Sequence, residues 1–227
     1  MKNGFTFKRK ELKYLITQKQ KDALIHDISS YIKPDAFEKY TICNIYLDTK
    51  DDRLIGDSIQ KPLYKEKIRI RSYGPVTDEE KIYIELKKKY EGIVYKRRIS
   101  MPYGEAKAYL TGDASRVGQI ENEIDYFLNY YGKLHEAMFI AYDRHAFSGN
   151  EDPELRITFD DNIIWRDSDV TLNSEVFGQQ LLEGDQYILE IKCSNAMPLW
   201  LAQALSKQKI YKTSFSKYGQ AYKIQFN

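Results

Sequence analysis

The segment from Lys65 to Arg71 alternates basic residues with other types, and its basic residues could bind an anion. Successive side chains of a β-strand point to opposite faces, so this spacing places four basic residues on one face: Lys65, Lys67, Arg69 and Arg71. A guanidinium group binds phosphate oxygens with two parallel hydrogen bonds, which favours a phosphorylated ligand. A half-exposed strand of an ordinary sheet alternates in the same way, so this strand alone leaves both interpretations open.

The same alternation recurs in other predicted strands, and the charged positions are mostly of one sign. The basic ones are Lys13, Lys67, Arg69, Arg71, Lys87, Lys96, Arg98, Arg144, Arg156 and Lys192. The acidic ones are Glu11, Glu85 and Glu190. Like charges gathered in one space repel unless a polyanion fills it, and carboxylates among them could hold a divalent cation. The pattern favours a site for a metal-bound triphosphate or polyphosphate.

Composition indicates a folded protein with a net charge near zero, so any electrostatic function must come from local clusters of charge. Of the 227 residues 42% are hydrophobic, and 19 Tyr and 10 Phe exclude a disordered chain. One domain spanning residues 1–227 is expected, since barrels of this size commonly form single domains. The net charge of +2 disfavours a nucleic-acid-binding protein.

The cysteine usage and the apolar runs predict a cytoplasmic location. Cys43 and Cys193 have neither disulfide nor metal-type spacing, which is typical of a reducing compartment. The longest apolar run, Ala137–Tyr142, is too short to span a bilayer, so membrane association is expected only through a protein partner.

Periodicity predicts strands and helices along the whole chain. The expected strands are Phe7–Leu15, Ile42–Asp48, Lys65–Arg71, Lys81–Lys89, Ile93–Met101, Phe139–Phe147, Leu155–Asp160 and Tyr187–Ser194, with a hairpin turn at Glu91-Gly92. The expected helical segments are one from Thr17, with a capping box to Gln20, Asp51–Ser58, a short helix with Pro102 at its first position, Ile120–Tyr131, Pro198–Lys209 and Lys217–Tyr222.

These elements predict an α+β fold. Helices with an apolar stripe must cover the apolar faces of the strands, which turns the charged faces away from them. An open antiparallel sheet would leave the charged faces in water, whereas a closed barrel would direct them into a lumen. The predominance of basic residues favours a closed antiparallel barrel, a tunnel with a charged lumen and helices packed outside.

Seven short motifs occur in an order that resembles a known family. They are Glu11-Leu-Lys13-Tyr14, Arg69-Ile-Arg71-Ser-Tyr73, Glu85-Leu-Lys87, Tyr142-Asp-Arg144-His-Ala-Phe147, Arg156-Ile-Thr158, Leu189-Glu-Ile-Lys192 and Ser216-Lys217-Tyr218. Together they resemble the catalytic domain of the vacuolar transporter chaperone (VTC) complex. That domain is a polyphosphate polymerase of the triphosphate tunnel metalloenzyme superfamily.

The resemblance implies roles for particular residues. It implies that the catalytic groups are Arg69, Arg71, Lys87, Arg144, Arg156 and Glu190. Phosphate or nucleotide binding is expected of Lys13, Lys67, Lys96, Arg98, Lys192 and Lys217. A divalent metal, Mn²⁺ or Mg²⁺, is expected on Glu190, with Glu85 and Glu11 as further carboxylates.

The sequence departs from the family pattern at two positions. Arg9 stands where the wider superfamily has the first Glu of its Glu-x-Glu-x-Lys signature, which suits the polymerase branch better than the hydrolases. Ser214 stands where some members have a second lysine, and Lys212 is the available substitute.

The expected function is transfer of the γ-phosphate of ATP to a growing polyphosphate chain. A tunnel triphosphatase that hydrolyses a nucleoside or inorganic triphosphate, and a non-catalytic polyanion binder, stay open as alternatives. The resemblance also implies a stand-alone, bacterial-type version, and leaves open a membrane-protein partner.

Overall fold

The computed structural model describes residues 10–60, 62–91, 93–112, 117–194 and 196–226. These residues form two compact units. Unit 1 comprises described residues within Met1–Tyr40, Asp143–Ile163 and Leu182–Phe215. Unit 2 comprises those within Thr41–Tyr142, Ile164–Leu181 and Ser216–Asn227. Three of the five boundaries between the units fall within strands, at 40/41, 142/143 and 163/164.

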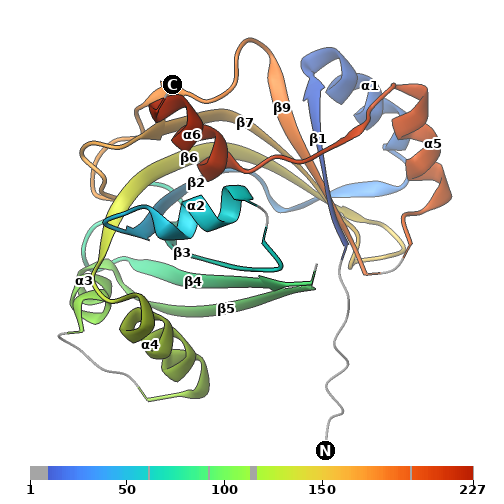
Figure 1. Cartoon of the computed structure of the whole chain (residues 1–227). Helices are drawn as coiled ribbons and strands as arrows, with labels where there is room; N and C mark the ends of the chain where they lie inside the picture. The colour runs from blue at the N-terminus through green and yellow to red at the C-terminus, as the bar shows by residue number, and fades with distance from the viewer. Residues whose placement is uncertain (1–9, 61, 92, 113–116, 195, 227) are drawn as a thin grey trace, which may run out of the picture. The chain divides into compact units, whose positions relative to one another are not determined.

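The described residues form an antiparallel sheet and six helices (Figure 1). The strands are β1 (Lys10–Thr17), β2 (Ile32–Thr49), β3 (Tyr64–Ser72), β4 (Lys81–Tyr90), β5 (Ile93–Pro102), β6 (Leu134–Gly149), β7 (Arg156–Arg166), β8 (Gln179–Gln180), β9 (Gln186–Cys193) and β10 (Lys212–Thr213). The helices are α1 (Gln18–Ile28), α2 (Arg53–Gln60), α3 (Tyr103–Thr111), α4 (Gln119–Tyr131), α5 (Leu199–Lys207) and α6 (Lys217–Gln225).

The predicted α+β class is confirmed, but the predicted closure into a barrel is not. Hydrogen-bonded neighbours follow the order β10-β1-β9-β7-β6-β2-β3-β4-β5, with β8 on β7. Within the described residues this order is an open path that ends at β10 and β5, because those two strands do not pair with each other.

Most predicted elements are present, with boundary differences that have physical causes. Strand β2 begins ten residues before the expected Ile42, in a polar stretch whose Pro34 removed any strand signal. Pro102 is the N-cap of α3 rather than its first residue, because its ψ of 147° is extended rather than helical. The expected strand start at Phe7, the residue Arg9 and the turn residue Gly92 lie outside the described residues.

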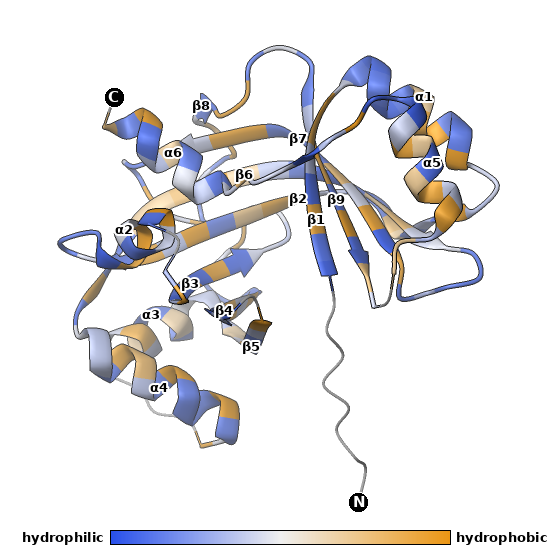
Figure 2. Cartoon of the chain, turned by 45° about the vertical axis from the view of Figure 1, so that its right-hand side comes forward, coloured by the Kyte–Doolittle hydropathy of each residue, from blue (hydrophilic) through white to orange (hydrophobic). Residues whose placement is uncertain are grey.

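The core of unit 2 lies between helices and one face of β3, β4 and β5. Alternate residues of these strands, such as Ile68, Ile84 and Ile99, are buried in one hydrophobic cluster with Tyr109 of α3 and Phe127 of α4. Apolar and polar residues alternate along the strands in Figure 2, as the two-residue period requires. The basic residues that alternate with these apolar ones project from the face opposite α3 and α4; they are Lys67, Arg69, Arg71, Lys87, Lys96 and Arg98.

The core of unit 1 repeats this arrangement with different elements. Leu189 and Ile191 of β9 and Phe159 of β7 are buried with Leu24 of α1 and Leu201 of α5. The predicted capping box of α1 is confirmed, since the Thr17 hydroxyl accepts from the backbone N–H of Gln20 at 3.2 Å. Among the described residues no helix is both long enough and apolar enough to cross a membrane.

Candidate functional site

In unit 2, strand register arranges the predicted basic residues in three cross-strand rows on the face opposite α3 and α4. The first row is Lys67, Lys87 and Lys96. The second is Tyr46, Arg69, Glu85 and Arg98, and the third is Asn44, Arg71, Tyr83 and Ser100. Directly opposite residues of antiparallel strands lie side by side, so one surface gathers cations from three strands.

Glu85 is the centre of this surface, and four cations surround its carboxylate. Its Oε2 accepts from Arg69 Nε at 2.9 Å and from Arg69 Nη2 at 2.7 Å, and Arg71 Nη1 lies 3.7 Å away. Its Oε1 lies 2.6 Å from Lys96 Nζ and accepts from Arg98 Nε at 2.8 Å. The Glu85 side chain is 2% exposed. We call these five residues the Glu85 cluster; its formal charge is four positive and one negative, or +3.

The cluster changes the protonation behaviour of its members. Burial by itself would raise the pKa of Glu85, but Arg69, Arg71 and Lys96 outweigh burial and hold that pKa well below its usual range. Burial lowers the pKa of Lys96 to about 8, in spite of the opposing effect of Glu85. Glu85 is therefore ionised at neutral pH, and Lys96 loses its charge in the mildly alkaline range.

Neutral polar residues hold the buried Arg71 and the partly buried Arg69 in place. Arg71 Nε donates to Asn44 Oδ1 at 2.9 Å, and Arg71 Nη2 donates to the Tyr142 hydroxyl at 3.3 Å. Asn44 is fully buried, and its Nδ2 donates to the Ile140 carbonyl at 3.0 Å, which fixes the orientation of its amide. Arg69 Nη1 donates to the Tyr46 hydroxyl at 3.0 Å. The guanidinium groups are thus pre-positioned.

Helix α6 lies on the charged side of unit 2, so not every helix covers an apolar face as predicted. The Tyr218 ring stacks on Tyr46 at 4.6 Å, and its hydroxyl donates to Asp48 Oδ2 at 2.9 Å. Lys217 is buried, with Nζ 4.3 Å from the centre of the Tyr142 ring. Lys67 Nζ donates to Ser216 Oγ at 3.1 Å.

Asp48 is a structural carboxylate rather than a site residue. Its Oδ1 and Oδ2 accept from the backbone N–H groups of Leu54 and Ile55 in the first turn of α2 at 2.8 and 3.0 Å. Burial raises the pKa of Asp48, and these hydrogen bonds oppose the rise. Asp48 therefore connects β2 to α2, and through Tyr218 to α6.

In unit 1 a second group of predicted residues surrounds Glu190. Glu190 Oε1 lies 3.1 Å from Lys13 Nζ, and its Oε2 lies 3.6 Å from both Lys192 Nζ and Arg144 Nη2. Glu11 is 3.5 Å from the same Lys13 ammonium. Arg144 makes a bidentate pair with the buried Asp160, with hydrogen bonds of 2.6 and 2.7 Å. We call Glu190, Lys13, Lys192 and Arg144 the Glu190 cluster.

Two other predicted basic residues, Arg156 and Lys212, lie outside the Glu190 cluster. Arg156 lies opposite Lys192 in register, on the charged face as predicted, but it is 46% exposed and pairs with Asp35. Lys212 lies opposite Tyr14, whose side chain is buried in the core, whereas Lys13 lies opposite Thr213. Lys212 thus projects from the face opposite Lys13 and is not a substitute for the lysine missing at Ser214.

The Glu190 cluster can hold a divalent metal only with help from a substrate. Thr158, the cross-strand neighbour of Glu190, has a buried hydroxyl without a hydrogen-bond partner, so a carboxylate and a hydroxyl oxygen share one row. No group of three or more His, Cys, Asp or Glu in the described part of the chain could hold a metal. Mg²⁺ commonly takes one or two carboxylates and completes its shell with water and phosphates, and these residues fit that kind of binding.

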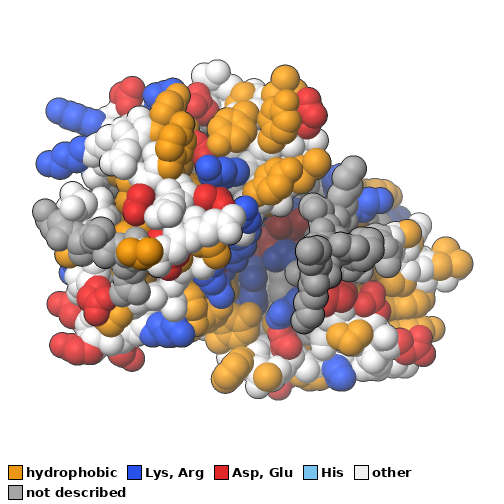
Figure 3. All heavy atoms as spheres, turned by 90° about the horizontal axis from the view of Figure 1, so that it is seen from below, with side chains coloured by type: hydrophobic (Ala, Val, Ile, Leu, Met, Phe, Trp, Pro, Cys, Tyr) orange, Lys and Arg blue, Asp and Glu red, His pale blue; other side chains and the backbone are white. Residues whose placement is uncertain are grey.

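The predicted site residues thus divide between the two units. Arg69, Arg71, Lys67, Lys87, Lys96, Arg98, Lys217 and Glu85 belong to unit 2, and Lys13, Glu11, Arg144, Arg156, Glu190 and Lys192 belong to unit 1. Convergence of all of them on one lumen stays a prediction. Lys and Arg side chains gather on the face of the molecule shown in Figure 3.

Sequence reasoning missed the neutral partners of the arginines. Asn44, Tyr46 and Tyr142 carry no charge, so a pattern of charged residues does not reveal them. A signal existed, because Asn44 and Tyr46 alternate with apolar residues in the predicted strand Ile42–Asp48. A polar side chain at such a position marks the face shared with Arg69 and Arg71.

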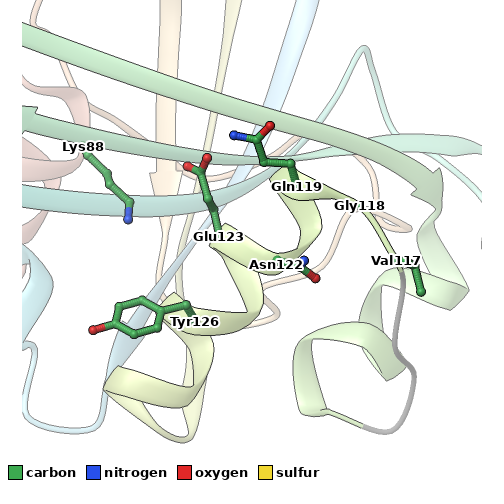
Figure 4. Close-up of a pocket in the computed structure, with 7 residues that line it drawn as sticks. All are labelled: Lys88, Val117, Gly118, Gln119, Asn122, Glu123 and Tyr126. Atoms are coloured by element: carbon green, nitrogen blue, oxygen red, sulfur yellow. The ribbon is translucent and has the colours of Figure 1, made fainter.

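A cavity of about 610 Å³ lies elsewhere in unit 2 and contains none of the predicted site residues (Figure 4). It is lined by Lys88, Val117, Gly118, Gln119, Asn122, Glu123 and Tyr126. Its charged residues already have partners, since Lys88 pairs with Glu66 at 3.3 Å and Glu123 with Arg97 at 2.7 Å. The cation-rich surface, rather than this cavity, is the candidate site.

Solved structures resemble the chain in fold, and a family model matches its sequence. A candidate adenylate cyclase from Bacillus halodurans has a crystal structure with a TM-score of 0.57 and 14% identity, over 92% of this chain and 95% of that one. A candidate adenylate cyclase from Vibrio parahaemolyticus has a TM-score of 0.51 and 14% identity, over 94% of this chain and 97% of that one. At such identities the likeness concerns the fold alone. No curated protein matches the sequence significantly. The sequence model of the VTC domain matches residues 8–226, so the chain belongs to the VTC domain family.

Proposed function

We propose that the protein is a polyphosphate polymerase, which transfers the γ-phosphate of ATP to the end of a polyphosphate chain. The observation that supports this most strongly is the Glu85 cluster, in which four cations are held by one buried carboxylate. Family membership supports the same class of reaction. The roles of individual residues below are part of the proposal.

The Glu85 cluster suits a chain of phosphates. Its formal charge of +3 attracts a polyanion, and the three cross-strand rows spread the cations along a surface rather than at a point. Arg69 and Arg71 are fixed by Tyr46 and Asn44, so little side-chain freedom is lost when phosphate oxygens bind. Strand side chains replace the glycine-rich backbone cradle used by other nucleotide-binding proteins.

The reaction requires charge stabilisation more than proton transfer. The bond between the γ-phosphorus and the oxygen that bridges it to the β-phosphate breaks, and a new bond forms from a terminal oxygen of the polyphosphate chain to that phosphorus. ADP leaves with the bond electrons. The attacking oxygen is already anionic, so no general base is needed. The transition state spreads negative charge over the equatorial oxygens, which fixed guanidinium groups such as Arg71 would stabilise.

A divalent metal, Mn²⁺ or Mg²⁺, would be held by Glu190, with the Thr158 hydroxyl beside it in register. When bound, the metal would neutralise phosphate charge. Lys13, Lys192 and Arg144 surround the same carboxylate and would keep it oriented. Cations contact the oxygens of both carboxylates, but those at Glu85 lie closer, at 2.6–2.9 Å for Lys96, Arg98 and Arg69, than those at Glu190, at 3.1–3.6 Å, so Glu85 is less suited to a metal. The closed tunnel, the cytoplasmic location and a membrane-protein partner stay predictions.

Incubation of the purified chain with ATP and Mn²⁺ or Mg²⁺ tests the proposal. A long anionic polymer, sensitive to a polyphosphatase and accompanied by ADP, is the expected product. Free phosphate without polymer would instead indicate a triphosphatase, and binding without turnover would indicate a polyanion-binding protein.

Two alanine variants of neighbouring arginines provide a matched comparison. Arg98→Ala removes a cation of the Glu85 cluster and should reduce polymer formation. Arg97→Ala removes the same charge one residue away, from the opposite face, where Arg97 pairs with Glu123. Equal losses in the two variants would contradict the assignment of the site to the charged face.

A further inference from the structure

An aromatic pair lies at one end of the charged face of unit 2. Tyr83 is the cross-strand neighbour of Arg71, and Tyr73 follows β3 two residues after Arg71. The two rings meet edge to face, with centres 5.9 Å apart and an angle of 81° between their planes. Tyr73 is 52% exposed, which leaves ring surface open to solvent.

The turn that carries Tyr73 is held in one conformation. Gly74 has a φ of +86°, in the left-handed region that favours glycine. Its N–H donates to the Thr41 carbonyl at 3.1 Å, and Ser72 Oγ donates to the Gly74 carbonyl at 2.6 Å. These contacts fix the backbone on both sides of Tyr73.

Arg98 connects the aromatic pair to the Glu85 cluster. Its guanidinium carbon lies 4.1 Å from the centre of the Tyr83 ring, and its Nε donates to Glu85. Arg98 Nη2 lies 3.5 Å from the Tyr73 hydroxyl oxygen, within hydrogen-bonding range. The Arg98 side chain therefore reaches from the aromatic rings to the other cations of the cluster. In a nucleotide the ribose likewise separates the base from the phosphates, so a base at the rings would leave the phosphates near the cations.

We propose that Tyr73, supported by Tyr83, stacks on the base of the nucleoside triphosphate while its phosphates bind the Glu85 cluster. This inference rests on the proposed function and adds a specificity determinant to it. Stacking on an aromatic ring tolerates any base, so the site would select nucleoside triphosphates over inorganic triphosphate without strong selection among bases.

Binding measurements on three tyrosine variants test the inference. The probes are the non-hydrolysable β,γ-imido analogue of ATP and inorganic tripolyphosphate, titrated calorimetrically at constant salt and Mn²⁺. Tyr73→Ala should weaken binding of the ATP analogue about tenfold, the range expected for one lost stacking contact, and change tripolyphosphate binding less than twofold. Tyr73→Phe keeps the ring and should retain both affinities. Tyr95→Ala is the matched control, because Tyr95 is 41% exposed and lies on the opposite face of β5.

The outcomes separate this inference from the proposed function. Unchanged binding of the ATP analogue in Tyr73→Ala would overturn the base contact, as would an equal loss for both probes. A wild-type protein that binds neither probe would overturn both proposals. A protein that forms no polymer from ATP, yet shows the Tyr73-dependent difference, would refute the polymerase and support the base contact.

Discussion

Replacement of Glu85 by Gln should destabilise the protein in a way that phosphate reverses. The substitution keeps the size of the side chain but removes the negative charge that Arg69, Arg71, Lys96 and Arg98 share. Glu85 is 2% exposed, so water replaces little of the lost interaction. The cations would then repel one another across distances set by the strand register.

The size of the effect follows from the geometry. At about 3 Å and an effective dielectric constant of about 20, a single pair of opposite charges interacts by roughly 5 kcal/mol. Desolvation offsets part of this energy, and loss of one partner from a buried ion pair typically costs about 3–5 kcal/mol. For a chain of this length 1 kcal/mol shifts Tm by about 2–4 °C, so Glu85→Gln should lower Tm by roughly 6–20 °C.

Thermal unfolding at low salt, with and without inorganic tripolyphosphate, measures the effect. Tripolyphosphate should raise Tm more in Glu85→Gln than in the wild type, because its oxygens supply the missing negative charge to the native state. Glu66→Gln is the control: Glu66 is also buried in unit 2, but it pairs with Lys88 on the opposite face. In Glu66→Gln, tripolyphosphate should raise Tm no more than it does in the wild type.

The difference in stability between the wild type and Glu85→Gln should depend on pH. The cations hold the pKa of Glu85 below its value in the unfolded chain. The stabilisation by Glu85 is therefore complete above about pH 4.5 and decreases as the pH falls further, so the gap between wild type and variant should close in acid. The reasoning is refuted if Glu85→Gln melts with the wild type at neutral pH and gains no more from tripolyphosphate.

Three further predictions concern other residues. Asn44→Leu leaves the buried Arg71 Nε without its acceptor, so denaturant unfolding should show a loss of about 1–3 kcal/mol; a change under about 0.5 kcal/mol would contradict this role. Lys96 has a pKa of about 8 and bound phosphate favours its charged form, so tripolyphosphate affinity should fall from pH 7 to pH 9. Lys96→Met should bind more weakly at pH 7 and show a flatter profile by calorimetry, whereas an unchanged slope would exclude Lys96 as the titrating group. Glu190→Gln should reduce polymer synthesis far more than tripolyphosphate affinity, and full synthesis would show that the metal assignment to Glu190 is wrong.

Strand alternation predicted the composition of the charged face of unit 2 well. Arg69, Arg71 and Glu85 share a face because β3 and β4 keep a strict two-residue period while α3 and α4 cover the other side. Strand register determines which residues of neighbouring strands lie side by side, and periodicity within one strand does not show this. Register places Glu85 between Arg69 and Arg98 rather than beside any other pair, and cross-strand register depends on contacts distant in sequence.

Other features of the fold could not be predicted from the local sequence. The partner of Arg156, Asp35, lies in a polar stretch next to Pro34 that gave no indication of a strand. The position of α6 on the charged side depends on Tyr218 meeting Asp48, 170 residues away in sequence. An amphipathic pattern shows that a helix buries one face, but it does not show which surface the helix covers.

The contact of Tyr218 with Asp48 and Tyr46 has a consequence for sequence divergence. Tyr46 contacts both the Tyr218 ring and the Arg69 guanidinium, and Asp48 accepts a hydrogen bond from the Tyr218 hydroxyl. A smaller residue at position 218 would remove a hydrogen bond from the buried Asp48 and would open space beside the Tyr46 ring. Positions 46, 48 and 218 should therefore vary together among relatives, so that a substitution in the last helix is accompanied by changes in β2.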